Sequence, residues 1–561
     1  MKTFNIKTIT AAAGVFLILG GCTDLDVDIK SQYTGLPTGQ QAVDAISGSI
    51  YTRTVAVGEG WFVLNNISSD VAMCVSMDGN WYDGGIYVRE TLHQWNQEGD
   101  AGHLKGIWDD AFGGIVSCNT VLAQLDEADR NGKLGAAARC MRAYFYYFLT
   151  DNFGAVPLME KFGDVPDTRT PRSEMIKFCE KELLAVRDLL PSEIDASTYG
   201  KATRYVADAL LAKIYLNWQV YMNDDVTKYE PTEANPKLNE CIAMCDDIIS
   251  SGQFNLATGY VRKFMPDNGP QVKDFIFAVP FDHKLFQGNK VMRYWSYRNG
   301  HEQFSAVLGW KYPSNPGGLM RMNPEYADKF NLEGDERNQV ILRGEQNLYC
   351  IDGYVTDQPF IKSTTKIDED ELYTGSDPDA KVDHRVNFTR DVYIRDGLSN
   401  GVAQLNVGND LIGREMGYRS IKFFPDKNMT ADDGHNQSQD APVFRYADIL
   451  LMKAEAILRG GMSTNGDTPK SLLNQIRSYV NAPQATENPS LNDILDERAR
   501  ELLDEPWRRN DLIRFGKFED PTPFRALYAQ KELKEKFRRI FPIAKNTLET
   551  NSSWGQNPGY E

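Results

Sequence analysis

The most regular alternation of apolar and polar positions in the chain lies between residues 444 and 518. In its first part, apolar residues recur every three or four positions, which is typical of one face of an α-helix; they are Ala447, Leu450, Leu451, Ala454, Ile457 and Leu458. Gly460 ends this helix, a second apolar face follows around Leu472, and a third helix begins at Ser490, where Asp493 completes a capping-box pattern. None of these helices can bury its apolar face alone, so the pattern predicts stacked antiparallel helical hairpins.

The same helical rhythm occupies much of the first half of the chain. We expect helices over 40–51, from 107 onward, over 135–150 and over 172–190. The segment 202–216 alternates small and large side chains, as helices of tetratricopeptide type do when they nest, and 239–250 supplies its partner. Five consecutive aromatic residues at 144–148 predict a helix that is buried on all sides. The expected fold class is therefore mainly α.

Helical periodicity fails in two stretches. Residues 58–106 are rich in glycine and aromatic residues, and between 256 and 442 short β-like runs such as 274–279 alternate with clusters of glycine, proline and asparagine. Six of the nine tryptophans lie in or directly beside these two stretches: Trp61, Trp81, Trp95, Trp295 and Trp310 within them, and Trp108 just after the first. Loops that are held by a rigid scaffold are the usual place for binding residues.

Residues 1–21 have the pattern of a bacterial signal peptide. Lys2 and Lys7 give a positive start, and an apolar stretch over 11–19 is too short to span a bilayer. The small residues that follow end at Cys22, which predicts a lipoprotein whose Cys22 is acylated. A plain secretory signal with an incidental cysteine is the alternative. No apolar run of about 18 residues or more follows, so a lipid anchor would be the membrane attachment.

Charge and motifs narrow the chemistry. The formal net charge of −17 argues against nucleic acid as a partner, because phosphate binding needs a basic surface. The six histidines are scattered, and no zinc, phosphate-loop or serine-nucleophile motif is present. We therefore expect no cofactor, no metal and no catalytic residues. Most of the eight cysteines are interpreted as small buried hydrophobic residues.

Charged residues on the C-terminal helices resemble a catalytic or nucleic-acid site at first inspection. We interpret them instead as an ion-pair network that ties helices together, on solvated helix faces; they are Glu497, Glu501, Arg508 and Arg509. Asp496 and Arg500 stand four positions apart and are expected to pair on the helix surface.

Four ordered motifs punctuate the C-terminal half, at 444–448 (FRYAD), 497–502 (ERAREL), 508–512 (RRNDL) and 556–560 (QNPGY). Together they resemble the SusD/RagB family, the surface glycan-binding lipoproteins of Bacteroidetes-type bacteria. The resemblance implies a SusD-like fold with tetratricopeptide-type helical hairpins and a long irregular, partly β insert that carries ligand loops. It divides the chain into an N-terminal helical region, 22–255, with a ligand loop at 58–106, and a C-terminal region, 256–561. The latter comprises the insert 256–442, hairpins 443–518 and a tail 519–561. It also places Trp108 in the core.

Candidate ligand residues lie in two polar-aromatic loops, around 80–85 and 293–312. A sugar presents an apolar C–H face and a rim of hydroxyls, so a flat ring can cover the face while Asp, Asn or Arg side chains bind the rim. The best candidates are Trp81 and Trp295, followed by Tyr82, Asp83, Arg89, Tyr294, Tyr297 and Trp310. The alternative for each ring is packing in the core, because tryptophan is heavily buried on average.

The resemblance implies a lipid-anchored protein of the outer membrane, exposed at the cell surface. It would capture an oligosaccharide or polysaccharide and pass it to a TonB-dependent SusC-like transporter without cleaving it. Two alternatives stay open. A RagB-like lipoprotein would bind peptides, through backbone pairing and pockets rather than flat exposed rings. A surface glycosidase would need two carboxylates across a cleft, one with a raised pKa, and the sequence offers no positive sign of it.

Overall fold

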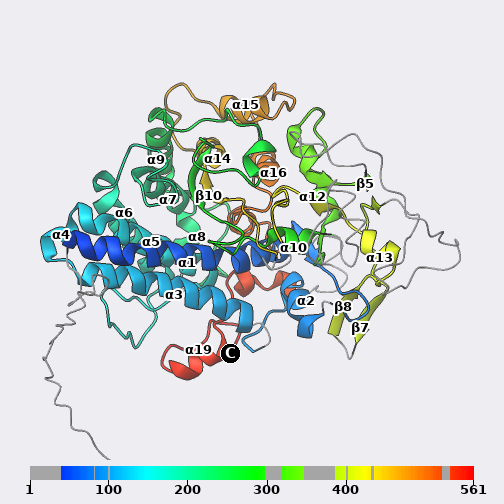
Figure 1. Cartoon of the computed structure of the whole chain (residues 1–561), viewed down its shortest axis with the longest axis horizontal. Coiled ribbons are helices and arrows are strands. Elements are labelled where there is room, and N and C mark those ends of the chain that lie inside the picture. The colour runs from blue at the N-terminus through cyan, green and yellow to red at the C-terminus, as the bar shows by residue number, and fades with distance from the viewer. Residues whose placement is uncertain are drawn as a thin grey trace, which may run out of the picture. The chain divides into compact units, whose positions relative to one another are not determined.

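Paired α-helices are the main regular structure in the described part of the chain, which confirms the mainly α fold class (Figure 1). The computed structural model describes residues 39–80, 82–98, 101–296, 317–346, 386–399, 402–430, 435–520 and 531–561. The longer helices are α1 (Gly39–Ser68), α3 (Ala101–Ala123), α5 (Lys133–Phe153), α6 (Arg172–Val186), α7 (Arg204–Leu216), α9 (Leu238–Ser250), α14 (Tyr446–Leu458), α15 (Pro469–Tyr479) and α16 (Leu491–Glu501). The shorter ones are α2 (Ile86–Thr91), α4 (Glu127–Asn131), α8 (Trp218–Met222), α10 (Val291–Trp295), α12 (Pro324–Ala327), α13 (Leu411–Glu415), α17 (Arg508–Arg514) and α19 (Lys545–Thr550).

The long helices pack in pairs, and the pairs contact one another. α1 runs antiparallel to α3, because Arg53 reaches Asp110 at 3.0 Å while Gly60 lies against Ile107. α5 packs against α3 and α6, α7 packs against α9, and α14 packs against both α9 and α15. The pairings of α7 with α9 and of α14 with α15 are those that the sequence predicted. The capping box at the start of α16 is also present, since the Ser490 side chain accepts the backbone N–H of Asp493.

The prediction that 58–106 is irregular is wrong in part. α1 continues to Ser68 and carries Trp61, α3 begins at Ala101 and carries Trp108, and both rings are buried. Glycine misled the prediction because Gly60 and Gly106 lie inside these helices rather than in turns. A Cβ at Gly60 would meet Ile107 at an ordinary contact distance of 3.5 Å, whereas one at Gly114, further along α3, would lie 2.4 Å from the ring of Phe145 in α5. Between the two helices, residues 69–98 do contain turns and only short elements.

The N-terminal and C-terminal regions share one hydrophobic core. Trp61 of α1 contacts Phe148 of α5 and Trp507, with ring centroids 4.1 and 5.8 Å apart. The aromatic run at 144–148 in α5 is buried throughout, as predicted. Residues Thr38–Glu561 form one compact unit, and the division into regions 22–255 and 256–561 stays a prediction.

The described β-structure consists of short antiparallel ladders of two strands each. The pairs are β1 (Ala72–Cys74) with β3 (Met320–Met322), β2 (Phe275–Val279) with β10 (Ala441–Arg445), β4 (Ile341–Leu342) with β9 (Arg419–Ser420), β5 (Gly344–Glu345) with β6 (Asn387–Phe388), and β7 (Asp396–Ser399) with β8 (Val402–Asn406). β2 falls on the β-like run that the sequence predicted. Because β2 pairs with the strand that leads into α14, it fixes the start of the insert to the C-terminal hairpins.

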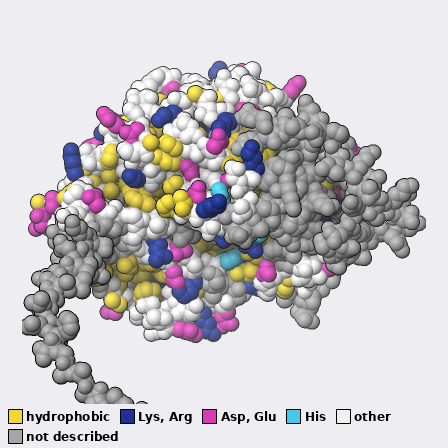
Figure 2. All heavy atoms as spheres, in the orientation of Figure 1, with side chains coloured by type: hydrophobic (Ala, Val, Ile, Leu, Met, Phe, Trp, Pro, Cys, Tyr) yellow, Lys and Arg dark blue, Asp and Glu magenta, His cyan; other side chains and the backbone are white. Residues whose placement is uncertain are grey.

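Acidic and basic side chains are interspersed over the described part of the face in Figure 2. Cys74, Cys118, Cys140, Cys179, Cys241 and Cys245 are buried free thiols, which confirms the interpretation of most cysteines as core residues. Among the described helices, none combines the length and hydrophobicity needed to cross a membrane.

Candidate functional site

The β1–β3 ladder joins the first predicted ligand loop to the described start of the second, at 293–296. β1 leads into residues 76–91, and the ladder is extended where the backbone N–H of Val75 donates to the carbonyl of Leu319 at 3.1 Å. On the other strand, the N–H of Gly318 donates to the carbonyl of Arg293 at 2.8 Å, which ties α10 to the same ladder. The ring of Tyr87 then meets that of Tyr294 edge-on, with centroids 6.2 Å apart.

The first loop presents a mixed polar and aromatic surface. Tyr82 is partly exposed and packs on a small apolar cluster, whereas Asp83 is exposed. Asp83 and Gly84 adopt φ values of 46° and 67°, a left-handed turn that favours glycine. Arg89 of α2 reaches back across this turn and donates to the carbonyl of Gly84 at 2.7 Å. The hydrogen bond from Arg89 therefore closes the turn and holds Tyr82 and Asp83 in position.

The second loop differs from its prediction. Trp295 is fully buried, and its indole N–H donates to Asp504 at 2.9 Å. A sealed ring cannot cover a sugar face, so Trp295 belongs to the core and its assignment as a ligand residue is corrected. Tyr294 is 8% exposed, and its ring contacts the ring of Tyr87, which lies beside the first loop. Trp81, Tyr297 and Trp310 lie outside the described residues, as does Cys22.

The β7–β8 hairpin adds a third side that the sequence did not predict. Asn406 donates to the Asp78 carboxylate at 3.0 Å, and the N–H of Asn409 donates to the other carboxylate oxygen at 2.8 Å. Just before β7, Val392 and Ile394 pack inward while Tyr393 points outward with 66% exposure. Asp78 and Asn406 are separated by 328 positions, and no local pattern signals such a pairing. We call the surface of Asp78, Tyr82, Asp83, Arg89 and Tyr393 the loop face.

The chemistry of the loop face suits binding rather than proton transfer. Burial raises the pKa of Tyr87 to about 12, so its phenol stays a neutral hydrogen-bonding group. Burial raises the pKa of four described carboxyls, Asp110, Asp208, Asp440 and Asp504, and of these Asp208 and Asp440 lie among scaffold contacts. Asp208, raised to about 7 chiefly by burial, pairs with Arg187 at 2.8 Å. Asp440, raised to about 6 by burial, accepts the hydroxyl of Tyr199 at 2.7 Å. Neither forms the pair across a cleft that glycoside hydrolysis requires.

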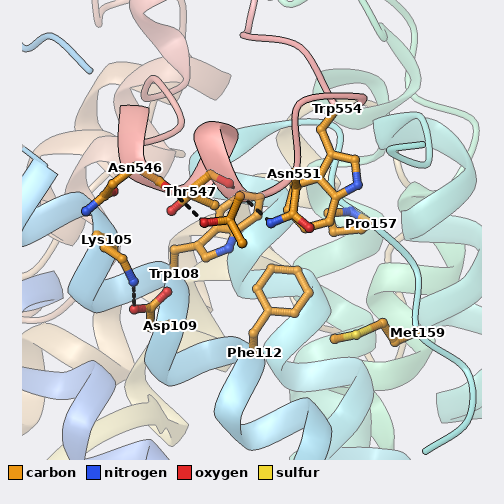
Figure 3. Close-up of a pocket in the computed structure, with 11 residues that line it drawn as sticks. Lys105, Trp108, Asp109, Phe112, Pro157, Met159, Asn546, Thr547, Asn551 and Trp554 are labelled. Atoms are coloured by element: carbon orange, nitrogen blue, oxygen red, sulfur yellow. Dashed lines mark hydrogen bonds and ion pairs between the residues drawn. The ribbon is translucent and has the colours of Figure 1, made fainter. Parts of the chain in front are cut away.

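A pocket of about 300 Å³ lies elsewhere, between α3 and the C-terminal segment (Figure 3). Its rings come from both sides: the centroid of Trp108 is 4.9 Å from that of Phe112 and 6.2 Å from that of Trp554. Its remaining lining is mostly polar and consists of Lys105, Asp109, Pro157, Met159, Asn546, Thr547, Thr550 and Asn551. Trp108 is 5% exposed, as expected of a core residue, yet it borders this pocket. We call this feature the aromatic pocket.

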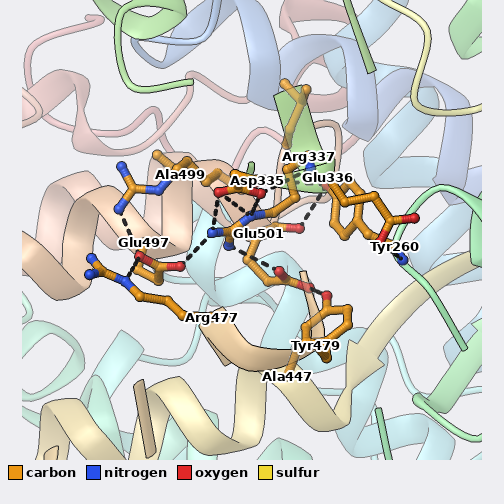
Figure 4. A network of polar contacts seen from close by, with 12 residues as sticks. Tyr260, Asp335, Glu336, Arg337, Ala447, Arg477, Tyr479, Glu497, Ala499 and Glu501 are labelled. Atoms are coloured by element: carbon orange, nitrogen blue, oxygen red, sulfur yellow. Dashed lines mark hydrogen bonds and ion pairs between the residues drawn. The ribbon is translucent and has the colours of Figure 1, made fainter. Parts of the chain in front are cut away.

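The predicted ion-pair network exists, but it is buried rather than solvated (Figure 4). Arg337 pairs with Glu497 at 2.6 Å, with Asp335 at 2.7 Å and with Glu501 at 3.2 Å, and all four side chains are fully enclosed. Arg445 joins Glu501 to strand β2 through Asp274. These ion pairs link α16, the insert and the start of α14, so their role is structural. Among the described residues, none of the charged side chains in this network faces an open site where catalysis could occur.

Two related predictions have different outcomes. Arg508 pairs with Asp70 at 2.6 Å, which joins α17 to the segment after α1. Asp496 and Arg500 do not pair with each other: Asp496 contacts Lys329, and Arg500 turns to Glu497 three positions away at 2.7 Å. The buried carboxylate of Glu497 attracts Arg500 more strongly than an exposed one, because fewer water molecules screen the interaction.

Comparison with known proteins identifies the class. The model of the SusD family matches residues 273–560, slightly more than half of the chain, and a second model, starch-binding associating with outer membrane, matches residues 24–216. The chain therefore belongs to the SusD family, and the predicted resemblance is confirmed. The family is one of binding proteins, in agreement with the expectation that the chain is not an enzyme.

Individual relatives cover most or all of this chain. The starch-binding protein SusD of Bacteroides thetaiotaomicron is 24% identical over 600 aligned residues, covering 100% of both chains. The SusD-like protein P25 of Formosa agariphila is 22% identical and covers 74% of this chain and 70% of its own. Surface glycan-binding protein A from Bacteroides fluxus has the same fold, with a TM-score of 0.67 at 18% identity over 93% of this chain and 100% of that one. The laminarihexaose complex of its counterpart from Bacteroides thetaiotaomicron gives a TM-score of 0.65 at 18% identity, with 93% of this chain and 100% of that chain covered.

Proposed function

We propose that this protein captures a glycan at the cell surface and passes it to a TonB-dependent SusC-like transporter. The observation that carries the proposal is the match to a starch-binding protein over the full length of both chains. A matched structure is described as a laminarin-binding SusD-like protein. Starch and laminarin are neutral polymers of glucose, so glucose polymers are the ligand class we propose first.

The loop face has the groups that this task requires. Tyr393 and Tyr82 offer partly or largely exposed rings for the apolar side of a sugar, and Asp83 offers a carboxylate for its hydroxyls. Asp78 is held by Asn406 and Asn409, and Arg89 closes the turn at Gly84, so the surface is ordered before any ligand arrives. A preformed site loses less conformational entropy on binding.

Attachment to the outer membrane would occur through Cys22. The positive residues Lys2 and Lys7, the short apolar stretch and the small residues before Cys22 are those of a lipoprotein signal. A family model that matches residues 24–216 is described as associating with the outer membrane. Lipid chains on Cys22 would hold the folded body at the membrane, where it could meet a transporter.

Calorimetric titration with maltohexaose and laminarihexaose tests the proposal. We expect at least one hexasaccharide to bind, and Tyr393→Ala to weaken that binding about fivefold or more, since an aromatic contact is worth roughly 1 kcal/mol. Phe286→Ala is the matched control, because Phe286 is also an exposed ring, at 51%, but lies outside the loop face. Reducing-end release would point to the glycosidase alternative, and binding of a peptide library without glycan binding would favour the RagB-like one.

A further inference from the structure

We infer that the aromatic pocket is a second carbohydrate site, which takes one or two sugar units of a neutral glycan. The inference rests on the proposed function, because it assigns a further site for the same class of ligand. The pocket shares none of its lining residues with the loop face. Its walls come from α3, from the segment after α5 and from α19 with the residues that follow it (Figure 3).

The size and the rings of the pocket fit a sugar. Its volume of about 300 Å³ is at the lower end of small-molecule sites, which span roughly 300–1,000 Å³. Phe112 and Trp554 are partly exposed, and the ring of Trp108 contacts each of them at an interplanar angle of 43°. Such a set of rings can cover the apolar face of a pyranose more completely than a single flat ring on an open surface can.

The polar groups of the pocket call for hydroxyl partners. The amides of Asn546 and Asn551 line this pocket and supply both donors and acceptors. A glycan, which alternates hydroxyls with C–H faces, matches this combination of groups.

The charges of the pocket favour a neutral ligand. Its lining contains one basic and one acidic side chain, Lys105 and Asp109, and these pair with each other one helical turn apart on α3. Their charges cancel locally, so the pocket offers neither a phosphate nor a free ammonium group a strong partner. Calcium requires several oxygen ligands, whereas this pocket offers a single carboxylate that is already paired.

The pocket is fixed in shape by hydrogen bonds behind its rings. The indole N–H of Trp554 donates to the carbonyl of Pro166 at 2.8 Å, and the carbonyl of Trp554 accepts from Arg169 at 3.0 Å. Arg169 also donates to the side chain of Asn557, which is itself buried. These bonds hold the chain after α19 against the helices. Two ordered sites on one body would raise the effective affinity for a long polymer that reaches both.

The test is a calorimetric titration of the full-length chain with maltohexaose and laminarihexaose, in which stoichiometry is read as well as affinity. We expect two sites per molecule for the hexasaccharide that binds. Trp554→Ala should remove one of them, and Tyr393→Ala should weaken the other about fivefold while leaving the pocket site intact.

A second variant guards against unfolding of the C-terminal segment. Thr550 lies on the exposed rim of the pocket, and Thr550→Trp would fill the space without touching the bonds that hold Trp554. If both pocket variants bind the hexasaccharide with unchanged stoichiometry and affinity, the inference is overturned while the loop-face function stands. If the wild-type protein binds neither hexasaccharide, the proposed function fails and the pocket assignment fails with it.

Discussion

The substitution Glu497→Gln removes one negative charge from the buried network around Arg337 while it preserves the size of the side chain. The Glu497 carboxylate accepts hydrogen bonds from Arg337 at 2.6 Å, from Arg500 at 2.7 Å and from Arg477 at 3.2 Å. Burial by itself would raise the pKa of Glu497, but the three guanidinium groups outweigh it and lower the pKa from 4.5 to about 2. The folded protein therefore favours the ionised carboxylate far more than the unfolded chain does.

The size of the effect follows from the two pKa values. Each pKa unit corresponds to about 1.4 kcal/mol, so a carboxylate that titrates near 2 in the fold and near 4.5 in the unfolded chain stabilises the fold by about 3 kcal/mol at neutral pH. Because the folded pKa is depressed, this contribution is complete above the unfolded pKa and is lost as the pH falls toward 2. At pH 3.5 about 2 kcal/mol should remain. Removal of one partner from a buried ion pair typically costs a similar amount, about 3–5 kcal/mol.

Urea unfolding followed by circular dichroism at pH 7.0 and pH 3.5 measures both quantities. The free energy of unfolding of Glu497→Gln should lie about 3 kcal/mol below that of the wild type at pH 7.0, and the gap should narrow at pH 3.5. Asp496→Asn is the matched control on the same helix, since the Asp496 side chain is 43% exposed and its pair with Lys329 should be worth less than about 1 kcal/mol. Equal stability of Glu497→Gln and wild type at neutral pH would refute the reasoning, as would a gap that does not depend on pH.

Three further predictions concern the core, pH and attachment. Trp295→Ala should lower the free energy of unfolding by about 3–5 kcal/mol because the ring is fully buried, whereas Tyr393→Ala, at an exposed ring, should change it by less than about 0.5 kcal/mol; equal losses in denaturant unfolding would contradict this placement. Burial raises the pKa of Asp440 from 3.8 to about 6, so the stabilisation from its protonated carboxyl is complete below pH 4 and is lost as the pH rises through 6. Between those pH values the free energy of unfolding of Asp440→Asn should rise relative to that of the wild type by up to about 3 kcal/mol. Parallel pH profiles of the two proteins would exclude the effect. Cys22→Ser should shift the protein from the membrane to the soluble fraction, and unchanged fractionation with [³H]palmitate labelling still present would disprove acylation at that residue.

The helical hairpins could be predicted from sequence because their signals are local. Apolar residues at three- and four-residue spacing, the glycine after α14 and the capping box at Ser490 each lie within a few positions of the structure that they specify. The role of Glu497 as part of an ion-pair network was predictable for the same reason. Its burial was not, because whether a charged helix face meets solvent depends on segments such as 335–337, which are distant in the sequence.

The candidate site was harder to predict because it depends on tertiary pairing. Glycine at position 60 indicates a loop by local rules, yet it lies inside α1, beside Ile107 of α3. Tyr393 and Asp78 belong to one surface only because β8 lies beside the segment after β1, a contact between residues more than 300 positions apart. The aromatic pocket joins α3 to the C-terminal tail, so the sequence offered Trp108 as a core residue without any sign of the space beside it.

The correction at Trp295 also explains how a helical scaffold can hold a binding surface in place. Three segments converge on the carboxylate of Asp504: the indole N–H of Trp295 donates to it at 2.9 Å, the amide of Asn66 in α1 donates at 2.7 Å, and the hydroxyl of Ser420 in β9 donates to its second oxygen. Trp295 directly follows Tyr294, whose ring meets Tyr87 beside the loop face. A buried, multiply bonded carboxylate thus fixes the segment behind the site to the longest helix. Since ordering a loop on binding costs roughly 0.5–1.5 kcal/mol per immobilised side chain, a surface anchored in this way can bind with only a few exposed rings.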